Sequence, residues 1–433
     1  MLVEFRFSNF RSFKDEVVFS MEPLSQNGVN PNVINTNLKK ISQLYRTSGI
    51  FGANASGKSN FLLALTNFIT LIRKSASYEF EKKIYTDKYL LDETHKDMPT
   101  FFEISLLIGW NLYKYGFKYN EEKIIEEYLY ASNISETGTS RENKIFHRKE
   151  NIVEKSKGFL QRWIDELAPN RLFLSELINL RKCSIPAVVA TYTEICQNIN
   201  YMSMTSKNDI PFDMITNNTK NRIINLIQNA DLGIVNITAK PLDWNSLKMS
   251  LLEDGIKITA EQEEIIQTSF LLKETEVIDL KSHHITENGA LKEFDFYKIE
   301  SKGTQVFLTL TQPIIQALEE GKTLFVDELD SSLHPYLVKY IIEMFNDDEI
   351  NKNNAQLIFT SHAHYLMDGD HLSRDQIWFV SKETNNGFHS DLYSLSDFNI
   401  KVNRKNVSFY NAYIHGVYGG VPFMEKINAS NTK

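Results

Sequence analysis

The chain has 433 residues, of which 42% are hydrophobic and 24% are charged, a composition typical of a globular protein with a sizeable core. Its net charge of −8 argues against a generally basic surface for binding nucleic acid. A local basic patch remains compatible with this charge. No apolar run approaches the roughly 20 residues that span a bilayer, and the first residues lack the layout of a signal peptide, so we expect a cytoplasmic protein without a membrane partner.

Residues 2–20 alternate between apolar and polar side chains, for example at Val3, Phe5 and Phe7. This period of two predicts two β-strands that are joined around residues 9–13 in a hairpin. Similar alternation returns over residues 101–119 and 124–130, so we expect these segments to extend the same antiparallel sheet.

Residues 52–59 fit the pattern G-x-x-x-x-G-K-[ST], between a strand-like run and an apolar helix. Gly52 and Gly57 let the backbone turn tightly and approach a phosphate, which a side chain would obstruct. Lys58 can reach the β- and γ-phosphates of a nucleotide, the Ser59 hydroxyl can ligate Mg²⁺, and the helix N-terminus favours an anion. The residues that we expect to bind ATP here are Gly52, Asn54, Ala55, Ser56, Gly57, Lys58, Ser59 and Asn60.

From about residue 155 the apolar period changes from that of a strand to that of a helix. We therefore predict that residues 151–275 form a mainly helical insertion, without the heptad repeat of a coiled-coil arm. Its expected elements are a helix that ends at Pro169, a helix that begins at Pro186 with an apolar stripe reaching Ile199 and Met202, helices near residues 223–227 and 261–273, and strand-like pieces at 234–237 and 256–259.

The segments 277–285 and 291–299 flank an Asn-Gly pair, which is a good signal for a hairpin because both residues tolerate a positive φ. His283 and His284 are neighbours on the first strand, so they point to opposite faces and are poorly placed to share a metal ion. The two cysteines, Cys183 and Cys196, are too few for a disulfide framework or a metal site, and we expect reduced thiols.

The run at residues 323–328 ends in two carboxylates, Asp327 and Glu328. Apolar strands suit the middle of a parallel sheet, whose ligand sites lie at the C-terminal ends of the strands. Beside a P-loop, Asp327 is expected to hold Mg²⁺ through its water shell, and Glu328 to polarise the water that attacks the γ-phosphate. A third strand, residues 355–360, leads to His362, which can donate a hydrogen bond to the γ-phosphate. Taken singly, these features would be ordinary strand ends.

Five segments follow one another in this order: the P-loop, Ser-Lys-Gly-Thr-Gln at 301–305, the run at 324–328, Asp-Ser-Ser-Leu-His-Pro at 330–335 and Thr-Ser-His at 360–362. Together they resemble an ABC-type ATPase head of the SMC and RecF kind, and in particular the OLD-like AAA-type ATPases of bacterial anti-phage defence systems. Residues 9–13, Asn-Phe-Arg-Ser-Phe, are similar to the start of those proteins. The resemblance covers residues 1–130 and 280–425, and it is far more specific for the ATPase than for a biological role.

The resemblance implies roles for residues outside the P-loop. Arg11 would lie near the nucleotide phosphates. Ser301 and Gly303 would contact the γ-phosphate of ATP held by the opposite subunit, and Asp330 would couple the two sites. Residues from Ser301 to Thr304 would open a helix, whose free N–H groups suit an anion. Hydrolysis would then need a dimer, because neither subunit would have a complete site.

Some features depart from the pattern of these ATPases. The signature lacks the Leu and the paired glycines of transporter ATPases, and no C-x-x-C motif exists for the zinc hook of coiled-coil repair ATPases. No Gln occurs between Asn60 and Glu150, so we assign no residue to the usual Q-loop ligand. Pro313 is expected to kink the helix that follows the signature. The residues after His362 are fewer than a typical domain needs, so we expect no fused nuclease domain. The tail at 413–422 indicates a tight turn, with an interface role left open.

The sequence thus predicts an α/β fold: an ABC-type ATPase head that combines a P-loop core with a parallel sheet, an antiparallel N-terminal β sheet and a mainly helical insertion. The expected boundaries are 1–150, 151–275 and 276–433. We expect an ATPase that uses ATP and Mg²⁺, forms a nucleotide-sandwich dimer or a higher oligomer, and controls a separately encoded effector nuclease or toxin in abortive infection. The alternatives are a RecF-like DNA repair or recombination ATPase and an ATP-bound scaffold with little hydrolysis, and DNA binding is left open.

Overall fold

A computed structural model describes most of the chain, and it divides the chain into two compact units that we describe separately. The first unit comprises Met1–Thr205, Ala317–Ser331 and Val338–Lys433, and the second comprises Ser206–Gln316 and Ser332–Leu337. The described residues are 1–25, 30–135, 138, 141–150, 152–155, 158–179, 184–204, 220–230, 232–242, 244, 248–249, 259, 267, 278–382, 388–398 and 409–421.

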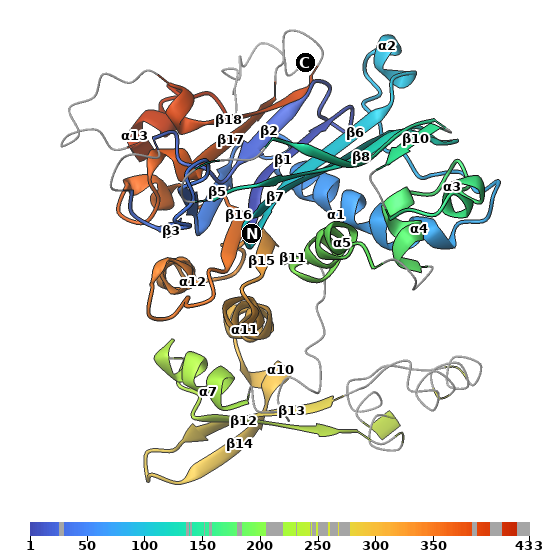
Figure 1. Ribbon diagram of the computed structural model, residues 1–433. Coiled ribbons are helices and arrows are strands. Elements are labelled where there is room, and N and C mark those ends of the chain that lie inside the picture. The colour runs from blue at the N-terminus through green and yellow to red at the C-terminus, as the bar shows by residue number, and fades with distance from the viewer. Residues whose placement is uncertain are drawn as a thin grey trace, which may run out of the picture. The chain divides into compact units, whose positions relative to one another are not determined.

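A seven-stranded antiparallel sheet contains the N-terminal hairpin (Figure 1). Strand β1 pairs with β2 on one side and with β6 on the other, so the first strand of the chain lies inside the sheet. The strands predicted from the alternation over residues 2–20, 101–119 and 124–130 are confirmed. In order across the sheet, the strands are β10 (Ile152–Lys155), β9 (Asn143–Lys149), β8 (Ile124–Asn133), β7 (Asn111–Tyr119), β6 (Thr100–Ile108), β1 (Leu2–Ser8) and β2 (Val17–Ser20).

The helices α1 (Lys58–Lys74), α4 (Phe173–Asn179) and α5 (Pro186–Gln197) pack beside this sheet (Figure 1). Phe61 and Phe68 lie seven residues apart and therefore on one face of α1. Phe61 contacts Phe5 of β1 with ring centroids 6.1 Å apart, and Phe68 contacts Phe102 of β6 at 5.9 Å. All four rings are fully buried, so the helix that follows the P-loop is fixed to the sheet by an aromatic core.

A second, six-stranded sheet carries the P-loop strand in its interior. All its neighbouring pairs are parallel except the pair of β17 and β18. Every residue of β5, β15 and β16 is buried, as expected for parallel strands that are covered on both faces. In order, the strands are β11 (Ile199–Ser203), β15 (Thr323–Asp327), β16 (Gln356–Thr360), β5 (Thr47–Phe51), β17 (Ile377–Lys382) and β18 (Ser390–Ser394).

The segment after Pro186 differs from its prediction. Pro186 opens α5 as expected, but this helix ends at Gln197, and Ile199 and Met202 belong to strand β11. The helix predicted as far as Met202 is therefore wrong over its last part. A spacing of three favours a helix, because residues three apart lie on opposite faces of a strand, and the pairing of β11 with the distant β15 overrides this local preference.

The observed units also differ from the predicted boundaries at 151 and 275. Residues 152–204 belong to the first unit, because α4 and α5 pack on α1 and β11 extends the parallel sheet. Most residues of the predicted pieces at 256–259 and 261–273, together with Cys183 and Pro422, lie outside the described residues.

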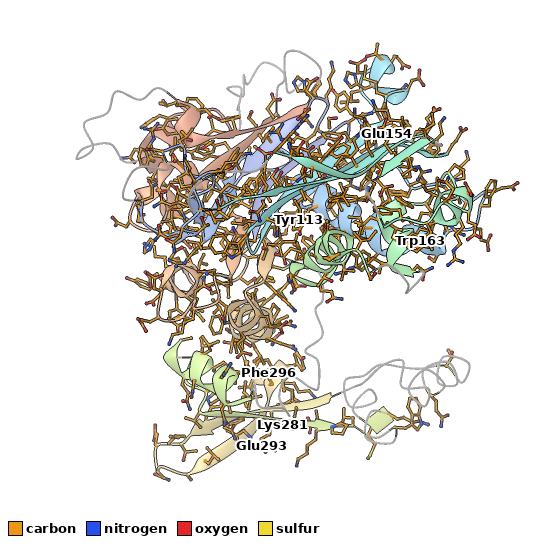
Figure 2. All side chains as sticks on the ribbon, in the orientation of Figure 1. Tyr113, Glu154, Trp163, Lys281, Glu293 and Phe296 are labelled. Carbon is orange, nitrogen blue, oxygen red and sulfur yellow. The ribbon has the colours of Figure 1, made fainter. Side chains whose placement is uncertain are left out.

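The second unit contains a three-stranded antiparallel sheet, ordered β12 (Asn236–Pro241), β13 (Ile278–Ile285) and β14 (Leu291–Asp295). The predicted hairpin is confirmed, with Gly289 at φ +76° in its turn. Figure 2 shows Lys281 and Glu293 on this sheet and Phe296 on the adjoining helix α10 (Phe296–Ile299), where Phe296 is fully buried. Helices α7 (Lys220–Asn229) and α11 (Lys302–Glu320) begin in this unit.

The two histidines of β13 do not share a ligand. The His283 ring lies 2.9 Å from the Thr238 hydroxyl, whereas the His284 ring lies 2.7 Å from the Glu300 carboxylate. Among the residues that the structure describes, no group of three metal-ligating side chains is found.

The remaining elements are short connections within the first unit, apart from α12, which begins in the second. These remaining elements are the strands β3 (Val33–Asn35) and β4 (Gln43–Tyr45), the helices α2 (Glu93–Lys96), α3 (Arg162–Asp165), α12 (Pro335–Asn346) and α13 (Phe409–Ile414), and the 3-10 turns η1 (Ser75–Ser77), η2 (His364–Asp368), η3 (Arg374–Gln376) and η4 (Leu395–Asp397).

Within the described part of the chain, no helix combines the length and apolarity that a bilayer crossing requires.

Candidate functional site

Two glycines shape the loop between β5 and α1. Gly52 has φ +154°, and a Cβ there would lie 2.3 Å from the carbonyl oxygen of Val380. Gly57 has φ +120°, and a Cβ there would lie 2.5 Å from Oγ of Ser390. Both positions therefore require glycine, for the positive φ and for the close approach of β17 and β18.

The Lys58 amine lies inside this loop. Its Nζ donates to the carbonyl oxygens of Gly52 at 2.8 Å and of Ala53 at 3.0 Å. Burial lowers the pKa of Lys58 to about 8, although the nearby carboxylates of Asp327 and Glu328 act in the opposite direction. The loop thus holds a cation that is costly to bury, which favours an anionic ligand at this position.

The other P-loop residues differ in exposure. Asn54 and Ala55 are exposed, and Ala55 has the left-handed φ of +60°. Ser56 is 2% exposed, and its hydroxyl has no hydrogen-bond partner among the residues that the structure describes. A buried hydroxyl without a partner is uncommon, and an oxygen of a ligand would satisfy it.

The two residues predicted to hold Mg²⁺ meet at the C-terminal edge of the parallel sheet. Oγ of Ser59, in the first turn of α1, lies 3.4 Å from Oδ1 of Asp327 at the end of β15. The same carboxylate oxygen accepts a 2.6 Å hydrogen bond from the Thr360 hydroxyl at the end of β16. A hydroxyl and a carboxylate are the oxygen ligands that Mg²⁺ prefers, so this pair fits the ion.

Glu328 follows directly in the left-handed conformation, with φ +56°. Its N–H donates to the Thr360 hydroxyl at 2.8 Å. A non-glycine residue in this region costs about 1 kcal/mol or more, and such conformations cluster at functional sites. The strand end therefore places the Glu328 carboxylate beside Asp327 on a constrained backbone.

His362 follows β16 and is tied to the segment after Glu328. Its backbone N–H donates to the Asp330 carboxylate, with distances of 3.1 and 3.3 Å to the two oxygens. Burial and the charge of Lys58 lower the pKa of the imidazole, so His362 is neutral at pH 7. The neutral ring has one donor and one acceptor nitrogen.

Arg11 lies at the first turn of α1, on the side of Asn60. Its guanidinium donates to Oδ1 of Asn60 at 3.1 Å and pairs with the Asp87 carboxylate. Asn60 in turn donates to Oγ of Ser12 at 2.8 Å. The consecutive residues Arg11 and Ser12 thus connect the segment at 9–13 to Asn60 of the P-loop helix.

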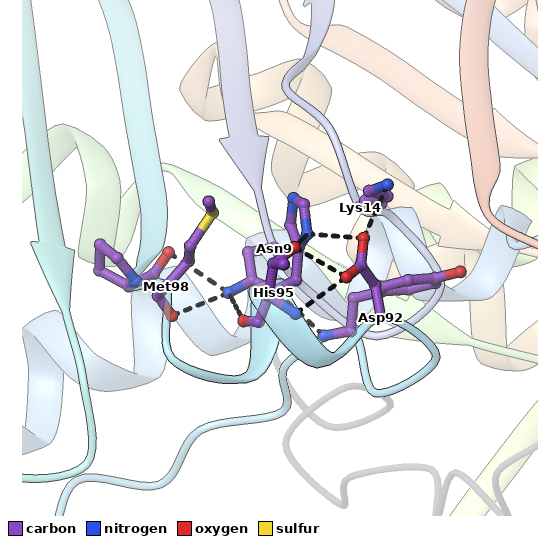
Figure 3. A network of polar contacts seen from close by, with 8 residues as sticks. Asn9, Lys14, Asp92, His95 and Met98 are labelled. Atoms are coloured by element: carbon purple, nitrogen blue, oxygen red, sulfur yellow. Dashed lines mark hydrogen bonds and ion pairs between the residues drawn. The ribbon is translucent and has the colours of Figure 1, made fainter. Parts of the chain in front are cut away.

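Asn9 anchors this segment from inside the fold, as Figure 3 shows. Its Nδ2 donates to the carbonyl oxygens of His95 and Met98, each at 2.9 Å. Its Oδ1 accepts the Tyr89 N–H at 3.2 Å, so one buried amide joins the N-terminal turn to the chain before β6. The neighbouring Asp92 pairs with Lys14 at 2.8 Å and closes the network.

The signature residues lie in the second unit. Thr304 donates its N–H to Oγ of Ser301 at 3.1 Å, which caps α11 in the way that the sequence predicted for a helix start here. Gly303 is closely packed, because a Cβ there would lie 2.6 Å from the carbonyl oxygen of Ser332. Helix α11 continues through Pro313 to Glu320.

Sequence reasoning missed the residues that hold the site together. Thr360 binds the Asp327 carboxylate and the Glu328 backbone N–H, Ser12 and Ser390 support the P-loop, and Asp87 holds Arg11. Thr360 was visible as the last residue of a strand, but its role depends on β16 lying beside β15. The others carry no local signal, because each contact joins residues distant in sequence.

The site residues fit a nucleotide phosphate and its Mg²⁺. The loop supplies an amine and an unpartnered hydroxyl for an anion, together with the first N–H groups of α1. Ser59 and Asp327 supply oxygens for a hard cation, with Glu328 adjacent. The structure brings these residues together in the first unit, whereas Ser301, Gly303 and Thr304 lie in the second.

A protein-family model described as "AAA domain, putative AbiEii toxin, Type IV TA system" matches residues 48–173 and 212–368. These segments contain the P-loop, the signature residues, both strand-end carboxylates and His362, and they make up more than half of the chain. No curated protein matches the chain. The match and the site together establish that the chain belongs to this AAA-domain family.

Proposed function

We propose that this protein binds ATP with Mg²⁺ and hydrolyses it as an ABC-type head of the OLD-like kind. The observation that carries the proposal is the distance of 3.4 Å between Oγ of Ser59 and Oδ1 of Asp327. These residues follow different strands that are not neighbours, since β16 separates β5 from β15. Membership of the AAA-domain family supports nucleotide chemistry at this edge of the sheet.

Binding would begin at the P-loop. Lys58 would exchange its bonds to the loop carbonyls for the β- and γ-phosphates, because a charged acceptor makes a stronger hydrogen bond than a carbonyl. The Ser56 hydroxyl and the first N–H groups of α1 would bind the remaining phosphate oxygens.

Hydrolysis would depend on Asp327, Glu328 and His362. Bound Mg²⁺ stabilises the charge that develops on the transferred phosphoryl group. Ser59 and Asp327 would hold it, and Thr360 keeps the Asp327 carboxylate oriented. Glu328 would accept a proton from the attacking water, and neutral His362 would donate a hydrogen bond to the γ-phosphate.

A second copy of the chain would complete the site. Ser301, Gly303 and Thr304 form a capped helix start, and the resemblance to SMC and RecF heads assigns this segment to the nucleotide of the opposite subunit. Asp330, which binds the backbone of His362, would link the two sites. ATP would then close a dimer and hydrolysis would reopen it.

The family also suggests a biological setting. Its description names a putative AbiEii toxin and a Type IV toxin–antitoxin system, which supports a role in anti-phage defence. In this setting the nucleotide state would control a separately encoded effector, either a nuclease or a toxin.

The biochemical test uses ATP turnover, nucleotide binding and size by light scattering. Lys58→Ala should lose nucleotide binding, because the loop loses its cation. Glu328→Gln should still bind ATP, hydrolyse it about 100-fold more slowly or worse, and accumulate as a dimer. Glu349→Gln is the matched control, since this carboxylate is exposed and outside the site. If Glu328→Gln hydrolysed ATP at the wild-type rate, the assignment of Glu328 as the base would be wrong.

The biological test is a pull-down of the tagged protein from its native host. Wild type and Glu328→Gln should both recover a nuclease or toxin, and ATP should change how much is retained. Recovery of recombination proteins and DNA in its place would overturn the defence role and leave the ATPase intact.

A further inference from the structure

The C-terminal helix α13 lies against the turn η2, which begins two residues after His362. The ring of Tyr413 contacts the ring of His364 at the start of this turn, with centroids 4.8 Å apart. Just past the end of the turn, a Cβ on Gly369 would lie 3.8 Å from the ring of Phe409. Phe409 and Tyr413 are four residues apart, so one face of α13 contacts both ends of the turn.

Tyr413 is itself fixed by the parallel sheet. Its side chain is buried, and its ring stacks on that of Phe379 in β17, with centroids 5.2 Å apart and an angle of 8° between the planes. Its hydroxyl donates to the carbonyl oxygen of Gly420 at 2.9 Å, which ties the end of the C-terminal turn to the same ring. Because β17 pairs with the P-loop strand β5, Tyr413 connects the core of this sheet to η2.

The backbone of His362 lies between two points of attachment. On one side its N–H donates to the Asp330 carboxylate at 3.1 Å. On the other side the buried Ala363 leads directly to His364, whose ring is held by Tyr413. Closely packed side chains transmit displacements rather than absorb them, so a shift of His364 moves the backbone of His362 as well.

We propose that Tyr413 is a positioning residue for ATP hydrolysis: through His364 it holds His362 where the imidazole donates a hydrogen bond to the γ-phosphate. This inference rests on the proposed function and deepens it, because it makes the C-terminal segment a part of the same site. A hydrogen bond weakens steeply as its angle and length depart from the optimum, so a small displacement of His362 reduces its contribution. ADP has no γ-phosphate, and its binding therefore does not depend on Tyr413.

The test measures kcat for ATP together with the affinities for ADP and for AMP-PNP, an ATP analogue that resists hydrolysis and keeps the γ-phosphate. Tyr413→Ala should lower kcat about tenfold, bind AMP-PNP about fivefold more weakly and bind ADP as wild type does. His364→Ala removes the same ring contact from the other side and should reproduce this pattern. Tyr413→Phe keeps the ring and should stay within about twofold of wild type. Tyr410→Ala is the matched control, because this tyrosine of α13 is 40% exposed, and it should change none of the three quantities.

A double-mutant cycle with His362→Ala identifies the route of the effect. If Tyr413 acts through His362, Tyr413→Ala should not weaken AMP-PNP binding any further in protein that already carries His362→Ala. The cycle is measured on AMP-PNP affinity because this quantity needs no residual turnover. A further fivefold loss would show that Tyr413 acts on another part of the site, and this result would overturn the inference.

The other outcomes separate this inference from the function on which it rests. If Tyr413→Ala and His364→Ala both kept the wild-type kcat and AMP-PNP affinity, the inference would be wrong and the proposed function would stand. An equal loss of ADP and AMP-PNP binding in Tyr413→Ala would also overturn the inference, because the C-terminal segment would then support the whole fold around the P-loop. A wild-type protein that does not hydrolyse ATP would overturn both.

Discussion

The Thr360 hydroxyl donates a hydrogen bond of 2.6 Å to Oδ1 of Asp327, across two neighbouring parallel strands. The same hydroxyl oxygen accepts the Glu328 N–H at 2.8 Å, and Thr360 is completely buried. One side chain at the end of β16 therefore fixes both carboxylate residues at the end of β15. In the proposed mechanism Thr360 would be a positioning residue, acting through the two residues that would hold the metal and activate the water.

Thr360→Val keeps the shape of the side chain and removes both hydrogen bonds. We expect ATP turnover to fall by roughly 10- to 100-fold, because the Asp327 carboxylate and the Glu328 backbone lose their anchor, and the Mg²⁺ concentration for half-maximal turnover to rise. Titration of turnover with Mg²⁺ measures both effects. Thr360→Ser retains the hydroxyl and should stay close to wild type. A wild-type Mg²⁺ titration in the valine variant would show that Asp327 does not need Thr360.

Nucleotide affinity should depend on pH through Lys58. Burial lowers the pKa of Lys58 to about 8, so the amine is charged below this pH and neutral above it. Only the charged form attracts phosphate, so ATP affinity should decrease as the pH rises from about 7 to about 9.5, by about tenfold. Lys58→Arg is the control, because guanidinium stays charged across this range and its residual affinity should not change with pH. Wild-type affinity that is constant over the range would contradict the lowered pKa.

Gly303 should be intolerant of a methyl group. A Cβ there would lie 2.6 Å from the carbonyl oxygen of Ser332, so Gly303→Ala must displace backbone in the signature segment. We expect a stability loss of about 1–3 kcal/mol and lower ATP turnover. Gly138→Ala is the control, since nothing lies within 4 Å of the corresponding Cβ. Urea unfolding and turnover of the two variants make the comparison, and equal behaviour would contradict the close packing.

Glu127 should be essential to the stability of the first unit. It is fully buried, accepts the N–H groups of Phe173 and Leu174 at the start of α4, and lies 3.9 Å from the buried Arg148. Burial raises the pKa of Glu127, which shows that desolvation opposes its charge. Glu127→Ala removes the carboxylate and leaves Arg148 and both N–H groups buried without this partner. We expect the free energy of unfolding to fall by about 3–5 kcal/mol.

The neighbouring Glu126 provides the matched control for this prediction. Its side chain is 19% exposed and pairs with Lys118 and His147 near the surface of β8. Glu126→Ala should cost about 1 kcal/mol or less, because surface ion pairs contribute little. Chemical denaturation of both variants tests the contrast, and similar losses would contradict the structural role of Glu127.

Much of the site was predictable because its signals are local. The spacing of Gly52, Gly57 and Lys58 specifies a loop that approaches a phosphate, whatever surrounds it. The apolar run before Asp327 indicates a buried parallel strand and hence a ligand-binding edge. The hairpin at Gly289 follows from two residues that tolerate a positive φ.

Other features depended on partners that lie far away in the sequence. The helical reading of Ile199 and Met202 failed because an apolar spacing of three does not reveal that β15 is available for pairing. The roles of Thr360 and Asp87 arise from contacts with Asp327 and Arg11, which belong to other strands and turns.

The sequence by itself determined the phosphate loop, the two carboxylates that follow a buried strand and most of the strands of the antiparallel sheet. These depend on backbone freedom, periodicity and the chemistry of single side chains. Only the tertiary structure decided the strand order, which places β16 between β5 and β15 and so brings Ser59 within 3.4 Å of Asp327. Strand order depends on which hydrogen-bonding edges meet when the chain folds, and no local pattern records that choice.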